Sequence, residues 1–143
     1  MPLSLWEISR SARGDAYNPV MTTGLVLFAH GARDPRWAEP FERLRRKVAA
    51  LRPDAPVTLA FLELMTPDLP TACAALVAQG AVRIRIVPIF LGQGGHVRQD
   101  LPALAAQVQA VHPAVPIELA TAIGDDDAVL DRIADVCVGG LPR

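Results

Sequence analysis

Residues 24–35 read GLVLFAHGARDP, and this stretch decides the fold. Its first six residues form a continuous apolar run of strand length, which is typical of a parallel strand covered by helices on both faces. His30 and Gly31 follow the run directly. The stretch therefore predicts the first strand of an α/β domain, with a histidine at the carboxyl end of that strand.

Three further segments repeat the order of a strand followed by a helix. We expect strands over residues 57–62, 83–90 and 116–123, with a strand end or bulge at Pro88, which cannot donate a hydrogen bond to a neighbouring strand. Successive strand-then-helix units favour a parallel sheet with helices on both faces. The sequence thus predicts a single-domain α/β fold built on a four-stranded parallel sheet.

Apolar residues at three- and four-residue steps mark the four helices. For the second helix we expect Thr66 as the N-cap, Pro67 at the first helical position and Gly80 just beyond the end. Residues 91–99 are expected to form a loop before the third helix. The apolar positions of the four helices, in chain order, are Phe41, Leu44, Val48 and Leu51; Leu69, Cys73, Leu76 and Val77; Leu101, Leu104, Val108 and Val111; and Val129, Leu130, Ile133 and Val136.

The composition is that of a globular protein, with 51% hydrophobic and 20% charged residues among 143. A net charge of -1 gives no basic excess, so we expect neither nucleic acid nor an anionic membrane as a partner. Residues 1–22 have no sustained periodicity and several turn-forming residues, so we expect a flexible N-terminal extension followed by one domain over 23–143.

The two cysteines, Cys73 and Cys137, lie in apolar helical patterns without metal-ligand spacing, and we expect both to be buried. No apolar run approaches the roughly 20 residues that span a bilayer, and the N-terminus lacks the apolar segment of a signal peptide. These features predict a cytoplasmic protein.

Three titratable side chains lie where predicted strands end. His30 follows the first strand, Glu63 follows the second, and His96 lies in the loop after the third. The carboxyl ends of parallel strands share one rim of the sheet, where ligands bind, so we expect the three residues on that rim. A hydrogen-bonded structural role is the alternative for each histidine, and capping of the next helix is the alternative for Glu63.

Two imidazoles and one carboxylate suit a divalent transition metal, and three protein donors leave coordination positions open for exchange. Gly94 and Gly95, like Gly31 and Gly92, permit either a close approach to a ligand or simply tight turns. Nucleotide binding is disfavoured, because neither a P-loop nor a GxGxxG motif follows a strand. Arginines in the same loops offer forks for carboxylates, although exposed arginines are often merely solvated; they are Arg33, Arg36 and Arg98.

Three motifs in this order and spacing resemble the short form of the class II metal chelatases, the sirohydrochlorin cobaltochelatase and ferrochelatase family. The motifs are LVLFAHGARDP (25–35), AFLELMTPDLPTA (60–72) and VPIFLGQGGHVRQDLP (87–102), and the resemblance extends from about Gly24 to Ile133. One departure is Ala32, where a serine commonly follows the His-Gly pair. The resemblance implies a homodimer of chelatase-like α/β subunits that inserts Co²⁺, Fe²⁺ or sometimes Ni²⁺ into a tetrapyrrole without nucleotide hydrolysis.

The resemblance also implies roles for the candidate residues. His30 and His96 would hold the incoming ion, Glu63 or a released histidine would accept a pyrrole proton, and arginines would meet the carboxylates of the macrocycle. Such a lyase should lose activity at low pH, where protonated imidazoles release the metal. A non-catalytic metal carrier of the same fold needs the same ligands and is the alternative function. A histidine phosphatase is disfavoured because Ala29 occupies the position where those enzymes have an arginine.

Overall fold

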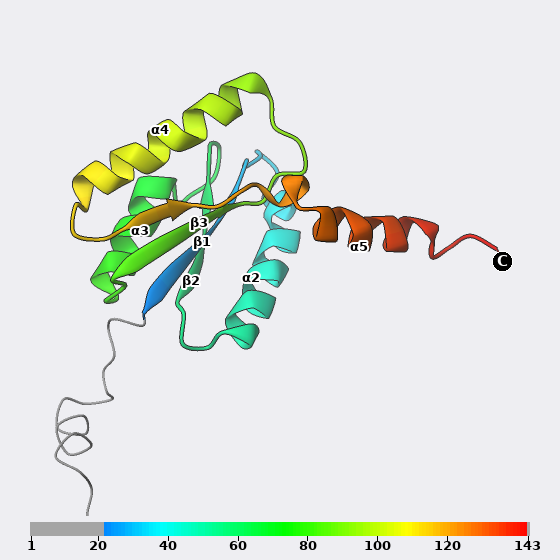
Figure 1. Cartoon of the computed structure of the whole chain (residues 1–143), viewed down its shortest axis with the longest axis horizontal. Coiled ribbons are helices and arrows are strands. Elements are labelled where there is room, and N and C mark those ends of the chain that lie inside the picture. Colours follow the sequence, from blue (N-terminus) through cyan, green and yellow to red (C-terminus); the bar gives the residue numbers. More distant parts are fainter. Residues whose placement is uncertain (1–21, 143) are drawn as a thin grey trace, which may run out of the picture.

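A computed structural model describes residues 22–142, and Figure 1 shows its arrangement. Four strands form one parallel sheet in the order β2-β1-β3-β4: β1 is Thr23–Ala29, β2 is Val57–Phe61, β3 is Arg83–Pro88 and β4 is Ile117–Leu119. The single-domain four-stranded parallel sheet is therefore confirmed. Residues 1–21 of the expected N-terminal extension lie outside the described residues.

Two hydrophobic cores lie on opposite faces of the sheet, because alternate residues of each strand point to opposite sides. On one face Val26 and Phe28 of β1 pack beneath α3 (Leu69–Ala78) and α4 (Gly95–Val111). On the other face Leu27 and Ala29 pack beneath α2 (Glu39–Leu51). Burial of both faces explains why the 24–29 run is apolar without alternation, and it confirms helices on both sides of the sheet (Figure 1).

The helix α3 begins two residues later than expected. Its N-cap is Asp68, whose side chain accepts a hydrogen bond from the Thr71 backbone N–H, so the prediction of Thr66 as the cap was wrong. Pro67 instead lies in the loop, where its carbonyl accepts from the backbone N–H of Phe61. The end of the helix is as expected: Gly80 has a φ of +97° and lies just beyond it.

The residues expected to form a loop over 91–99 are partly helical. α4 begins at Gly95 with Gly94 as its N-cap, so His96 and Arg98 lie in the first turn of a helix. The fourth strand is shorter than the expected 116–123, because the strand it pairs with, β3, ends at Pro88, which has no N–H to continue the ladder.

The last helix, α5 (Asp127–Val138), follows the short turn η3 (Ile123–Asp125) and extends away from the sheet (Figure 1). None of its residues is buried, and Cys137 is exposed, which corrects the expectation that both cysteines are core residues. Leu51 and Val111 are also exposed, because they are the last residues of α2 and α4. Within residues 22–142, no helix is both long and apolar enough to cross a membrane.

Candidate functional site

His30 and Glu63 form a side-chain pair at the carboxyl ends of β1 and β2. The Nε2 atom of His30 lies 3.0 Å from Oε1 of Glu63, and the two side chains are 46% and 56% exposed. The strands that carry them are neighbours, with Ala29 in register with Phe61. The structure therefore places a nitrogen and an oxygen donor together at the solvent-facing rim, as the strand-end positions predicted.

Backbone contacts hold Glu63 against the loop that carries His30. The Glu63 N–H donates to the His30 carbonyl at 3.1 Å, and the Glu63 carbonyl accepts from the Met65 N–H at 2.8 Å across Leu64, whose φ is +65°. A leucine in this left-handed region is strained, and such strain persists only where the surroundings impose the conformation. Glu63 is thus a positioned loop residue. It does not cap α3, whose N-cap is Asp68.

Gly31 makes this close approach of the two loops possible. Its φ is +96°, and a Cβ added there would lie 1.9 Å from the Glu63 carbonyl oxygen. Glycines were expected to serve either a close approach to a ligand or a tight turn. At Gly31 the structure supports the second explanation, because the backbone conformation there requires a residue without a Cβ. At Gly92, Gly94 and Gly95 a Cβ would meet no atom within 4 Å, so the fold itself does not require glycine there.

The ring of Phe90 packs against the ring of His30, a contact that was not predicted from the sequence. The two rings pack edge to face with centroids 6.3 Å apart, and Phe90 is only 7% exposed. Its carbonyl accepts the Gly124 N–H at 2.9 Å, which ties the segment after β3 to the turn after β4. The two rings meet because β1 and β3 are neighbours in the sheet. The contact could have been predicted only if that strand order had been known.

His96 lies in the first turn of α4, which follows the carboxyl end of β3, and the carboxyl ends of β1 and β2 carry the pair at the same edge of the parallel sheet. Within residues 22–142, however, no three histidine, cysteine, aspartate or glutamate side chains gather closely enough to hold a metal ion. The structure thus joins His30 to Glu63 and leaves His96 outside that pair. The role of His96 as a ligand stays a prediction.

The three candidate arginines differ in what they contact. Arg36 is held by Asp34 through several hydrogen bonds, and this guanidinium lowers the pKa of the Asp34 carboxyl below its ordinary value. Among the ion pairs of residues 22–142, none includes Arg33 or Arg98. The guanidinium groups of Arg33 and Arg98 are therefore better candidates than that of Arg36 for pairing with an anionic ligand.

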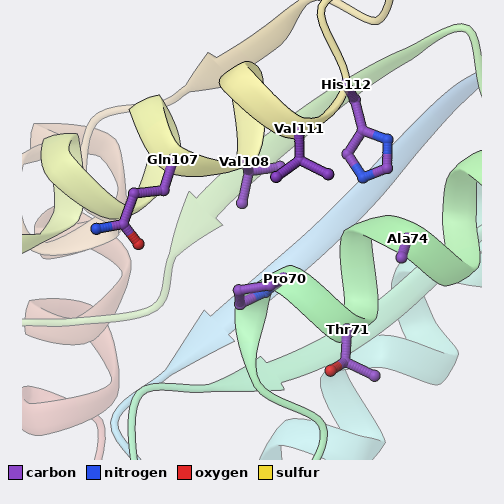
Figure 2. Close-up of a pocket in the computed structure, with 7 residues that line it drawn as sticks. All are labelled: Pro70, Thr71, Ala74, Gln107, Val108, Val111 and His112. Atoms are coloured by element: carbon purple, nitrogen blue, oxygen red, sulfur yellow. The ribbon is translucent and has the colours of Figure 1, made fainter.

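Shallow hollows flank the pair along the rim. A hollow of about 390 Å³ includes Arg33 and Met65, one of about 500 Å³ includes Glu63, and one of about 260 Å³ includes Arg98 and Thr121. A separate apolar groove of about 490 Å³ lies between α3 and α4 and contains none of the candidate site residues (Figure 2). Its lining residues are Pro70, Thr71, Ala74, Gln107, Val108, Val111 and His112.

The separation of the pair suits coordination of a single ion by both side chains. Two donors that each lie about 2.1 Å from one ion are separated by roughly 3.0–3.4 Å, depending on the coordination geometry. His30 Nε2 and Glu63 Oε1 lie 3.0 Å apart, which is within this range. A carboxylate is also a group that can act as a general base, so Glu63 is a candidate proton acceptor at the rim.

Comparison with known proteins identifies the family of the chain. Residues 24–137 match the CbiX family model. The chain belongs to the CbiX family. A relative of this CbiX-family chain is the sirohydrochlorin cobaltochelatase of Methanocaldococcus jannaschii, 35% identical over 88 residues. The matched region covers 62% of this chain and 62% of that relative, so it spans less than two thirds of the relative's length.

Two solved structures share the fold with this CbiX-family chain. A putative cobalamin biosynthesis CbiX protein from Marinobacter aquaeolei VT8 aligns with a TM-score of 0.73 and 34% identity, over 83% of this chain and 97% of that one. SirB from Bacillus subtilis, in a structure with Fe³⁺, aligns with a TM-score of 0.72 and 27% identity, over 85% of this chain but only 49% of that one. The chelatase-like fold expected from the motifs is confirmed.

Proposed function

We propose that this chain inserts a divalent metal ion, Co²⁺ or Fe²⁺, into sirohydrochlorin or a related tetrapyrrole without ATP. The observation that carries the proposal is the His30–Glu63 pair, a nitrogen and an oxygen donor 3.0 Å apart at the open rim of a CbiX-family fold. The M. jannaschii relative is a sirohydrochlorin cobaltochelatase, which supports both this reaction and cobalt as the ion. Enzymes of this kind are lyases.

The ion is a substrate, so the site has to bind it and then release it. We expect neutral His30, Glu63 and the predicted ligand His96 to replace only part of the water around the ion, which leaves positions open for pyrrole nitrogens. The small number of protein donors favours delivery over storage, because a closed set of four ligands would retain the ion. The half-exposed side chains of the pair leave a path for a macrocycle to reach it.

Metal insertion releases protons that the site has to accept. Two pyrrole N–H bonds break as two metal–nitrogen bonds form, so M²⁺ enters and two H⁺ leave with no change in oxidation state. The carboxylate of Glu63 accepts one of these protons when the ion moves from the side chains to the macrocycle. The imidazole of His30, freed from the ion at the same moment, is the second acceptor.

The carboxylates of a tetrapyrrole need cationic partners around this pair. Arg33 and Arg98 line hollows on the rim and have no carboxylate partner among the described residues, so we assign them this role ahead of Arg36, which Asp34 already holds. Gly94 and Gly95 at the start of α4 have open space around them for a flat ligand. The remaining expectations, a homodimer, a cytoplasmic location and use of Ni²⁺, stay predictions.

Turnover separates the enzyme from a metal carrier of the same fold. Purified protein at one twentieth of the sirohydrochlorin concentration should convert all of the tetrapyrrole with Co²⁺ or Fe²⁺ faster than the spontaneous reaction. A carrier would bind the ion but leave the rate at the spontaneous value. Initial rates with Co²⁺, Fe²⁺ and Ni²⁺ under the same anaerobic conditions then rank the ions.

A further inference from the structure

The helix α5 presents an apolar surface that nothing in the described part of the chain covers. None of its residues is buried, and it extends away from the sheet instead of packing on it (Figure 1). Leu130 is 44% exposed, Ile133 37% and Val136 65%. A surface helix normally packs its apolar stripe on a core, so this stripe indicates a missing partner.

Most of the larger apolar side chains of α5, Val138 excepted, lie on the side opposite its three aspartates. Three- and four-residue steps place five apolar residues on one side, which we call the α5 stripe: Val129, Leu130, Ile133, Val136 and Cys137. Asp127, Asp131 and Asp135 recur every four residues on the other side. Two copies of the α5 stripe can therefore meet about a two-fold axis without bringing the acidic sides together, as a self-complementary contact requires.

The base of α5 is anchored beside the candidate site. Gly124, in the turn that precedes the helix, donates its N–H to the carbonyl of Phe90, whose ring packs on His30. A Cβ at Gly124 would lie 1.9 Å from the Leu91 carbonyl oxygen, so the turn sits tightly on the segment after β3. Whatever docks on the α5 stripe is thereby held near the rim that carries His30.

The lengths of the relatives favour a second copy of this chain as the partner. This chain aligns with nearly all of the Marinobacter protein but with only 49% of the SirB chain, which contains about as much chain again beyond the match. We infer that the α5 stripe docks on a second copy of this chain and thereby sets that copy beside the His30–Glu63 pair. The inference rests on the homodimer of the proposed function and assigns it an interface.

The native mass of the full chain and of two matched variants tests this inference. We expect the wild type to have twice the chain mass by light scattering. Val136→Asp should weaken the dimer on the order of 100-fold, because each dimer then buries two unpaired charges. Ala128→Asp adds the same charge on the other side of α5 and should remain dimeric. A monomeric wild type, or a Val136→Asp variant as dimeric as Ala128→Asp, would overturn the inference.

Cys137 gives a second readout that needs no variant. Cys73 is buried, and burial raises its pKa to about 11, so a thiol reagent at pH 8 reports on Cys137. Labelling of the wild type should slow as the protein concentration rises and the α5 stripe becomes covered. Labelling that is independent of concentration in a dimeric protein would place the interface elsewhere and overturn the inference.

The same samples distinguish this inference from the proposed function. A dimer with a covered α5 stripe that gives no turnover of sirohydrochlorin would overturn the proposed function and leave the interface standing. A monomer that inserts Co²⁺ would overturn the interface and leave the proposed function standing. Melting temperatures of both variants check that each is folded.

Discussion

The Nε2 atom of His30 lies 3.0 Å from the Oε1 atom of Glu63, although the two residues are 33 positions apart in the sequence. Adjacent parallel strands bring them together, and the hydrogen bond from the Glu63 N–H to the His30 carbonyl joins their loops, which Gly31 allows to approach closely. The position of the pair thus follows from the topology of the sheet and from Gly31. Both side chains are about half exposed, so an ion or a proton from solvent can reach them.

Glu63→Gln keeps the size of the side chain but removes its ability to accept a proton. We expect kcat for metal insertion to fall about 100-fold, within the range for loss of a general base. The melting temperature should hardly change because the side chain is 56% exposed. Glu118→Gln, on strand β4, is the matched control and should retain the wild-type rate. Equal rates for both variants would show that Glu63 takes no part in proton transfer.

Gly31→Ala tests the contact that positions the pair. The added Cβ would lie 1.9 Å from a backbone oxygen at a φ of +96°, so we expect a loss of at least about 2 kcal/mol in the free energy of unfolding. Gly92→Ala places its Cβ in open space and should change stability by less than about 0.5 kcal/mol. Chemical denaturation of both variants measures the difference. An equally small effect at both positions would contradict the assigned role of Gly31.

Arg98→Ala and Arg36→Ala should differ in their effect on substrate binding. Arg98 has no carboxylate partner among the described residues, whereas Asp34 holds Arg36. We expect Arg98→Ala to raise KM for sirohydrochlorin about tenfold, the effect of losing one charge-assisted hydrogen bond. Arg36→Ala should leave KM nearly unchanged. The reverse order would contradict the assignment of Arg98, ahead of Arg36, to the carboxylates of the macrocycle.

The N-cap of α3 gives a pH dependence of stability. Its hydrogen bond from Thr71 lowers the pKa of Asp68 below the ordinary value of 3.8. The stabilisation is therefore present above about pH 4 and is lost as the pH falls through the lowered pKa. Asp68→Ala should cost about 1 kcal/mol at pH 7, whereas Asp68→Asn should retain most of the stability. A cost for Asp68→Ala that does not shrink under acid would contradict a carboxylate cap.

Much of the fold was predictable because apolar runs and breaker residues act locally. The buried run of β1, the strand end at Pro88 and the helix end at Gly80 all follow from short-range rules. The N-cap of α3 was not predictable in this way. Thr66 is followed by Pro67 and Asp68 by Pro70, and either proline suits the first turn of a helix. The start of α4 was missed because glycines favour loops, although Gly94 and Gly95 here begin a helix.

The candidate site was predictable only as far as strand ends define a rim. His30 and Glu63 could be placed on that rim from the sequence, but their contact depends on β1 and β2 being neighbours. The packing of Phe90 on His30 depends in the same way on the place of β3. The exposed position of α5 could not be foreseen, because an amphipathic pattern specifies a helix and not the surface that covers it.

His30 is proposed to bind the metal ion before the ion enters the tetrapyrrole. The most direct test of this role is the initial rate of Co²⁺ insertion into sirohydrochlorin by wild type and His30→Ala, with His112→Ala, at the end of α4 and away from the rim, as the control. We expect wild type and His112→Ala to exceed the spontaneous rate equally and His30→Ala to fall to it. A His30→Ala variant as fast as the wild type would contradict the account.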